Sequence, residues 1–310
     1  MTDELSGATA VRLDLRAARF VIDRAVAKAQ EFQVRGTFAI CDDAGTLISL
    51  SRMQGASAAG VRITRGKAAL TAMHQERSDV LDRRLRDSPA RFEAIRDLSP
   101  DLYPGAGAQF IKIDGRIVGA YASGSGYGPL KQIQGIDPSR LMADGQPANV
   151  EDLITAHALG IRYRDQHPQS NLVERSQGEL HEWNVGEIAQ TADERGVWAG
   201  FGERRPSLTL RTARALADAV LAAADRAVSV AICDEVGTPM QIDRMVDAPP
   251  MSVRRAEARA RTAFAEGTDG EGALLVRSAE GRVLGSIGVV GAGVDAAPDR
   301  LERIVAAATR

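Results

Sequence analysis

The sequence of 310 residues has neither a long apolar run nor an excess of charge of one sign. It contains no stretch of roughly 18 apolar residues, which a membrane helix needs, and no basic N-terminal segment followed by an apolar one. Its 39 basic and 41 acidic residues are well mixed. A nucleic-acid surface or a polybasic membrane patch needs clustered Lys and Arg. We therefore expect neither partner, and we expect a cytoplasmic protein.

Cysteine and histidine are also scarce. Cys41 and Cys233 are the only cysteines. They occupy equivalent positions of a repeat described below, where a buried apolar thiol is the simplest interpretation. The spacing of His157, His167 and His181, ten and then fourteen residues, differs from compact zinc signatures. The sequence also lacks a Walker loop, a dinucleotide fingerprint and a Ser-His-Asp order. We therefore expect no metal site and no cofactor.

One stretch of the chain occurs twice. Residues 39–53 and 231–245 are identical at eight of fifteen positions, at a constant offset of 192. Each stretch has a short apolar run, an acidic pair, a Gly and a second apolar run, which predicts a β-hairpin. Gly45 and Gly237 supply the positive φ that such a tight turn requires. The chain therefore contains two copies of one module.

The sequences around these hairpins repeat as well. Asp14 and Thr209 are good N-cap residues before apolar residues at helical spacing, so each copy begins with an amphipathic helix. A second glycine-centred hairpin and a closing helix follow in each copy. We expect an elaborated first module at 13–163, a lid or linker at 164–206, and a shortened second module at 207–310. The middle segment holds both tryptophans, which favours packing across the modules.

Three motifs of the first copy carry a resemblance to a known family. They are Arg52-Met53-Gln54-Gly55-Ala56, Lys67-Ala68 and Val118-Gly119-Ala120. Together with the helices and hairpins above, they resemble the GlcG/HbpS family of haem-binding-like proteins. The resemblance implies an α+β fold in which each module has an antiparallel sheet flanked by helices. Because family members assemble into dimers or rings, two fused copies should form an intramolecular pseudo-dimer, and a homo-oligomer is compatible with this arrangement.

The two copies differ most clearly in their last strand. Copy one has Tyr121 and Ser123 where copy two has Ile287 and Val289. Side chains of a strand alternate between its two faces, so Tyr121 and Ser123 point the same way. Copy one therefore has a hydroxyl-bearing strand face where copy two has an apolar one. This asymmetry predicts that the function is concentrated in copy one.

A glycine-rich turn follows this strand. Ser125 and Tyr127 alternate with Gly124, Gly126 and Gly128. Neither a Lys-Ser/Thr pair nor a helix start comes after it, so the turn is not a phosphate loop. We interpret it as a flexible lip around a pocket, with a plain loop as the alternative.

Four further residues complete the candidate site: Arg52, Gln54, Lys67 and His74. Arg52 ends a strand beside a helix N-terminus, which favours anion binding, although an ion pair with Asp42 or Asp234 would also explain it. Lys67 suits anion binding or proton transfer. His74, seven residues later on the same helix face, suits a general base or a haem ligand. The alternatives are a solvated Lys and a surface or capping His.

Two functions are compatible with these residues. The first is a cofactor-independent enzyme that binds a small anionic metabolite and acts by proton transfer, as a lyase, isomerase, hydratase or cyclase does. Its binding residues would be Arg52, Ser123, Ser125 and Gln54, and its catalytic residues Tyr121, Tyr127, His74 and Lys67. The alternative, implied by the resemblance alone, is a protein that binds haem or another tetrapyrrole for storage, sensing or degradation. Aromatic residues make up only 4% of the chain, which favours the enzyme.

Overall fold

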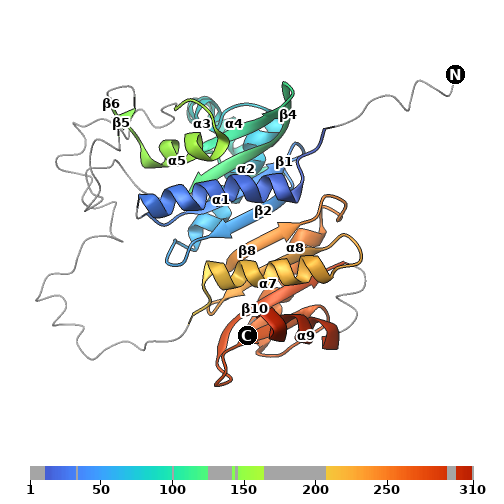
Figure 1. The fold of residues 1–310 in the computed structure, drawn as a ribbon. Helices are drawn as coiled ribbons and strands as arrows, with labels where there is room; N and C mark the ends of the chain where they lie inside the picture. Colours follow the sequence, from blue (N-terminus) through green and yellow to red (C-terminus); the bar gives the residue numbers. More distant parts are fainter. Residues whose placement is uncertain are drawn as a thin grey trace, which may run out of the picture.

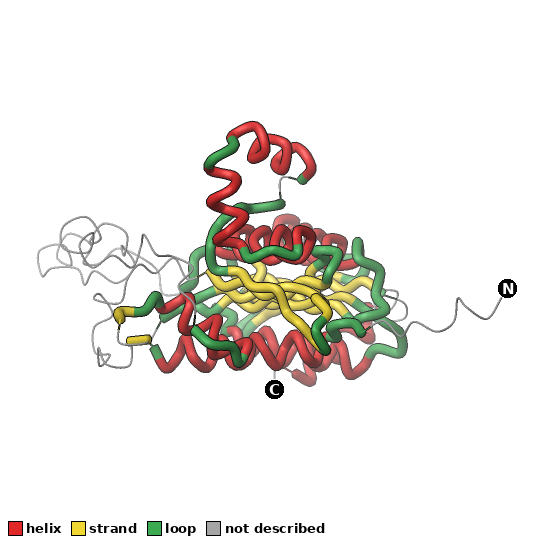
Figure 2. The backbone as a smooth tube through the Cα atoms, turned by 90° about the horizontal axis from the view of Figure 1, so that it is seen from above, coloured by secondary structure: helices red, strands yellow, loops and turns green. Residues whose placement is uncertain are grey.

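In the computed structural model the chain forms one wide β-sheet between two layers of helices (Figure 1, Figure 2). The structure describes residues 11–32, 34–99, 101–124, 142–143, 146–163, 207–291 and 298–308. The segment expected to be a lid or linker, 164–206, lies outside the described residues, and so do Ser125 and Tyr127 of the glycine-rich lip. No described helix is long and apolar enough to cross a membrane.

The first half contains a helix, a hairpin, three more helices, a second hairpin and a closing helix. These elements are α1 (Leu15–Glu31), β1 (Thr37–Asp42), β2 (Leu47–Arg52), α2 (Ala59–His74), α3 (Ser78–Arg86), α4 (Pro89–Leu98), β3 (Ala108–Ile113), β4 (Arg116–Gly124) and α5 (Val150–Leu159). A small separate sheet of β5 (Met142–Ala143) and β6 (Gln146–Pro147) precedes α5.

The second half repeats this order of elements, and in its described residues nothing corresponds to α3 and α4. It consists of α7 (Leu210–Ala223), β7 (Ser229–Asp234), β8 (Pro239–Arg244), α8 (Ser252–Glu266), β9 (Ala273–Arg277), β10 (Val283–Val290) and α9 (Pro298–Ala308). The leading helices begin at the predicted N-caps. Asp14 accepts a hydrogen bond from the Ala17 N–H at 2.7 Å, and Thr209 accepts one from the Thr212 N–H at 3.1 Å.

The eight long strands form one continuous antiparallel sheet in the order β3-β4-β1-β2-β8-β7-β10-β9. The last four strands mirror the first four. The halves join where β2 pairs with β8, with Leu50 opposite Ile242. This arrangement confirms the predicted α+β fold, with two sheet halves flanked by helices and fused into an intramolecular pseudo-dimer.

Helices cover both faces of the sheet (Figure 2). α2 and α8 cover one face, above an apolar core that runs across both halves. On the opposite face α1 and α5 cover the first half, and α7 and α9 cover the second. Cys41 and Cys233 are completely buried in their strands, and this burial raises the pKa of each thiol to about 12.

Matching ion pairs join the two halves. Arg52 pairs with Asp234, and Arg244, its counterpart at the offset of 192, pairs with Asp42. The Nε atom of each Arg also donates to a backbone carbonyl of the other half at 2.9 Å. A contact made twice by equivalent residues is what a two-fold arrangement produces. The ion pair considered for Arg52 is therefore present, and it connects the two halves.

Candidate functional site

The structure brings Lys67, Tyr121 and Ser123 into one buried polar cluster. Lys67 reaches from α2 past the start of β3, where its Nζ donates to the backbone carbonyl of Ala106 at 2.7 Å. The same Nζ lies 3.0 Å from Oε1 of Glu151, in the first turn of α5. Both side chains are almost fully buried, at 5% and 6% exposure. Lys67 is therefore not the solvated Lys that was the alternative.

Hydroxyl groups surround this ion pair on the side of Tyr121. The Ser123 hydroxyl lies 3.4 Å from Oε1 of Glu151 and 3.2 Å from the Thr155 hydroxyl. Thr155 in turn donates to the backbone carbonyl of Glu151 at 2.8 Å. The Tyr121 hydroxyl is fully buried on the same face and has no hydrogen-bond partner among the described residues. The predicted common orientation of Tyr121 and Ser123 is confirmed.

The surroundings keep the phenol of Tyr121 neutral. Burial raises its pKa well above the usual value, and the negative charge of Glu151 acts in the same direction. The neighbouring hydroxyls of Ser123 and Thr155 have the opposite effect and are outweighed. Tyr121 is thus an uncharged donor and acceptor at the inner end of the cluster.

A glycine lets the backbone approach the ion pair. Gly107 has a φ of +99°, a conformation that side chains disfavour. A Cβ at this position would lie 2.5 Å from Oε1 of Glu151 and 2.8 Å from Nζ of Lys67. The segment before β3 therefore closes directly over the charged pair.

The other predicted site residues lie elsewhere. The guanidinium of Arg52 is used in the contact between the halves. Gln54 is exposed and donates to the Ser207 hydroxyl at 2.9 Å. His74 is exposed at the end of α2. Sequence reasoning missed Glu151 and Thr155, since an acidic residue in a first helical turn is common for reasons of helix stability alone.

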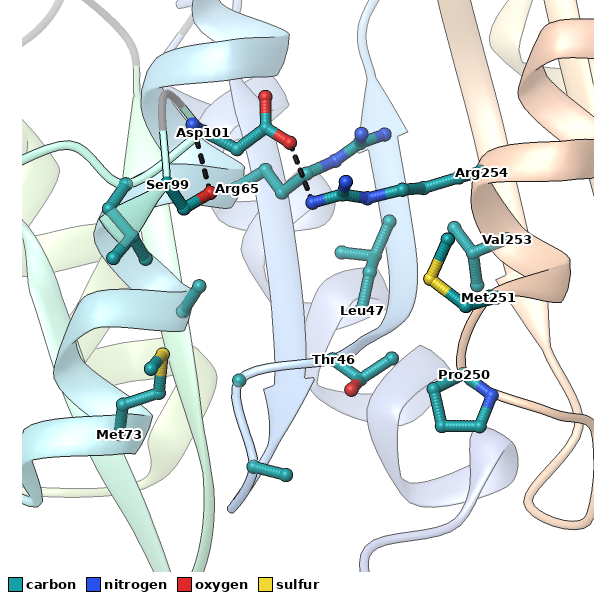
Figure 3. A pocket seen from close by; sticks show the side chains of 14 residues that line it. Thr46, Leu47, Arg65, Met73, Ser99, Asp101, Pro250, Met251, Val253 and Arg254 are labelled. Atoms are coloured by element: carbon teal, nitrogen blue, oxygen red, sulfur yellow. Dashed lines mark hydrogen bonds and ion pairs between the residues drawn. The ribbon is translucent and has the colours of Figure 1, made fainter. Parts of the chain in front are cut away.

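A groove between the two halves is a second candidate site (Figure 3). It has a volume of about 430 Å³ and lies on the α2 and α8 side of the sheet. Thr46 and Leu47 of the first hairpin form its floor, and Met73 on α2 and Met251 at the start of α8 face it from opposite sides. Further lining residues are Ala44, Gly45, Arg65, Ala69, Ser99, Asp101, Leu102, Pro250, Val253 and Arg254.

The rim of the groove carries two ion pairs. Arg254 on α8 lies 2.8 Å from Asp101, in the segment after α4 (Figure 3). Arg65 on α2 lies 2.8 Å from Glu257 on α8. One wall comes from the stretch that only the first half has, so the two halves contribute unequally to the groove. The first half is longer than the second between its two hairpins, and this difference in length was the sequence feature that could have indicated the groove.

Comparison with known proteins identifies the first half. The model of the family described as "Haem degrading protein HbpS-like" matches residues 13–128. The match supports the resemblance of this part of the chain to the HbpS-like family. The match includes Lys67, Tyr121 and Ser123 and ends before Glu151. It does not extend to the second half, so the membership of that half in the family stays a prediction. No curated protein sequence matches the chain.

Solved structures with a similar fold each correspond to about half of the chain. The PduOC–haem complex is 18% identical, covers 48% of this chain and 94% of its own, and has a TM-score of 0.38. The Klebsiella pneumoniae protein ORFY is 15% identical, with 50% and 94% covered and a TM-score of 0.38. HbpS is 18% identical, with 51% and 93% covered and a TM-score of 0.37.

Proposed function

We propose that this protein binds a tetrapyrrole of the haem class in the groove between its two halves. The groove carries the proposal, because it offers apolar side chains, thioether sulfurs and cationic groups in one place. Its volume of about 430 Å³ lies in the range of small-molecule sites. The family description of the first half, which names haem, supports the same ligand class.

The residues of the groove fit such a ligand. A haem needs apolar surface for its ring, cations for its two carboxylates and a side chain for the iron. Met73 and Met251 are half-exposed thioethers, a ligand type that haem iron accepts. Arg254 and Arg65 are the cations at the rim. The described histidines, His74 and His157, do not line the groove.

Each group has a definite task in this proposal. Met73 and Met251 would offer thioether sulfurs to the iron, and Leu47 would contact the apolar ring. The exposed Arg254 would exchange Asp101 for a ligand carboxylate. This exchange costs little free energy, because an exposed ion pair is weak. Bound haem would supply one-electron and oxygen chemistry, and the groove would limit the access of water to it.

A titration with haem, followed in the Soret region, tests the proposal. We expect saturable binding of one haem per chain. Met73→Leu and Met251→Leu keep the apolar volume and remove the sulfur, so at least one of them should shift the Soret band and weaken binding. His74→Ala is the matched control beside Met73 and should leave the spectrum unchanged. A spectrum that depends on His74 and on neither Met would refute the groove as the site.

The cationic rim has its own test. Arg254→Ala should weaken haem binding, since a charge-assisted hydrogen bond to a carboxylate is lost. Arg255→Ala is the matched control, because Arg255 is an exposed neighbour on the same helix that does not line the groove. Equal effects of the two substitutions would show that only the overall charge matters.

A second candidate function is proton transfer on a small anionic metabolite at the buried cluster. The buried hydroxyl of Tyr121 favours it, because it lies next to the hydroxyls of Ser123 and Thr155, and Ser123 in turn reaches Glu151. In this proposal Tyr121 gives and takes the proton, and Lys67 attracts the substrate's charge. The lyase or isomerase class proposed from the sequence belongs to this candidate.

Hydrogen exchange into small carboxylic acids tests this second candidate. A panel of 2-oxo and 2-hydroxy acids is incubated with the protein in D₂O, and loss of C–H signals is followed by NMR. We expect enzyme-dependent exchange in at least one compound, lost in Tyr121→Phe and kept in Ile287→Val, the matched change in the second half. No exchange with the unaltered protein, or equal loss in both variants, would refute it.

A further inference from the structure

Three threonine hydroxyls of the first half, those of Thr37, Thr64 and Thr71, are buried without a hydrogen-bond partner in the described part of the chain, and the first two lie beside glycines. Thr37 is the first residue of β1 and Thr64 lies on α2, and neither side chain is exposed. Oγ1 of Thr37 lies 2.9 Å from where a Cβ would stand on Gly60, and Oγ1 of Thr64 contacts Gly124 at the end of β4. A buried hydroxyl without a partner lowers stability, so it indicates that a partner is supplied from elsewhere.

These hydroxyls surround the N-terminal end of α2. The helix begins at Ala59 and has no side-chain cap, and Gly60 is its second residue. The Thr37 hydroxyl therefore lies at the first turn, where the helix dipole favours negative charge. The N–H groups of Gly60 and Val61 there donate to the carbonyls of Ser57 and Ala58. Gly60 and Gly124 have no side chains, and a Cβ on either would stand within 3 Å of one of the two hydroxyls.

The second half closes the corresponding place with its own side chains. Ser229, Ser252 and Ala256 stand at the offset of 192 from Thr37, Gly60 and Thr64. The Ser229 hydroxyl is bonded to the Ser252 hydroxyl at 2.7 Å, so it has the partner that Thr37 lacks. Thr37 pairs with Gly124 in the sheet, and its counterpart Ser229 pairs with Val290. The second half therefore has a valine side chain where the first half has none.

We propose that Thr37, Gly60, Thr64 and Gly124 form an oxyanion site, the α2 site, that binds the carboxylate or phosphate group of a small ligand. The two hydroxyls donate to the anion, and the positive end of α2 stabilises its charge. Carboxylate and phosphate share this chemistry. The α2 site shares no residue with the groove, so the two proposals can be tested independently of each other.

NMR on the full chain labelled with ¹⁵N tests the α2 site, with inorganic phosphate and acetate as separate probes. We expect saturable shifts of the Gly60 and Gly124 amides with at least one probe. Gly60→Ser gives the first half the residue that the second half has at this position. It should weaken binding about tenfold or more, because the new hydroxyl would form a hydrogen bond with the Thr37 hydroxyl in place of the anion. Thr37→Val removes the donor at nearly equal volume and should have the same effect. It serves as the second variant if Gly60→Ser does not fold.

Ser252→Gly is the matched control in the second half and should leave the shifts of Gly60 and Gly124 unchanged. Tighter binding of phosphate than of acetate would indicate a phosphorylated ligand, and the reverse a carboxylate. Two results would overturn the proposal. One is the absence of saturable shifts with both probes at tens of millimolar concentration. The other is undiminished binding in a folded Thr37→Val variant, which would mean an adventitious ion only.

Discussion

Lys67 and Glu151 have lost most of the water that would surround them in an unfolded chain. Such a pair is tolerated because both partners keep further hydrogen bonds, from Lys67 to the Ala106 carbonyl and from Ser123 to Glu151. The pair matters for stability mainly because removing one partner leaves the other charge buried and unpaired. A single buried charge costs several times more than the complete pair gains.

We therefore expect Lys67→Met to lower the free energy of unfolding by about 3–5 kcal/mol. The double variant Lys67→Met, Glu151→Leu should recover most of this loss, because no lone charge stays buried. Lys28→Met is the control: it breaks the partly exposed pair with Glu31 and should cost less than about 1 kcal/mol. Urea unfolding measures all three. Losses that simply add up in the double variant would contradict this account of the pair.

The residues of this cluster were only partly predictable. Strand alternation has a fixed period of two, so the common face of Tyr121 and Ser123 followed from the sequence. The partner of Lys67 did not, since Glu151 lies 84 residues further along the chain and looks like an ordinary helix-start acid. The unpartnered hydroxyls of Thr37 and Thr64 were equally hidden, because only the closeness of Gly60 and Gly124 reveals them.

At the scale of elements, the seam between β2 and β8 is short, and side chains reinforce it. Only three residue pairs are in register there. The Ser51 hydroxyl donates to the Gln241 side chain at 2.6 Å, and the Ser49 hydroxyl donates to Asp243 at 2.8 Å. Arg19 of α1 also donates to Asp243, at 2.7 Å and 3.1 Å. The seam is therefore a polar strip within an otherwise apolar sheet.

Arg52→Met and Arg244→Met should destabilise the protein by similar amounts, about 3–5 kcal/mol each, because each leaves a largely buried Asp unpaired at the same seam. Arg254→Met breaks an exposed pair and should cost less than about 1 kcal/mol. Thermal or urea unfolding gives these values. A small loss of stability in Arg52→Met, together with impaired ligand binding, would instead support the anion-binding role predicted for Arg52 from the sequence.

The groove shows why whole elements were easier to predict than the place of a site. Repeated hairpins and helix caps predict the elements, since these depend on local residues. The groove depends on how a stretch present in one half, from α3 to Asp101, reaches α8 of the other half. No local pattern encodes that contact. The domain limits at 163 and 207 and a homo-oligomer stay predictions.

At the scale of the whole molecule, the two halves share one sheet and one core. The apolar core under α2 and α8 includes residues of both halves, among them Leu50 and Ile242 at the seam. A half that unfolds alone would expose this shared surface and break the Arg–Asp pairs as well. The free energy of opening one half should therefore approach that of opening both.

Ile287→Ala in β10 tests this coupling. Ile287 is fully buried in the core of the second half, and shortening it should lower the free energy of unfolding by about 2–5 kcal/mol. If unfolding is cooperative across the seam, amide hydrogen exchange in β1 and β4 should accelerate by the same factor as exchange in β7 and β10. Phe20→Ala, an exposed side chain on α1, is the control and should change neither. Faster exchange confined to the second half would mean that the halves open independently, and the continuous sheet would then be a contact between two separately stable units.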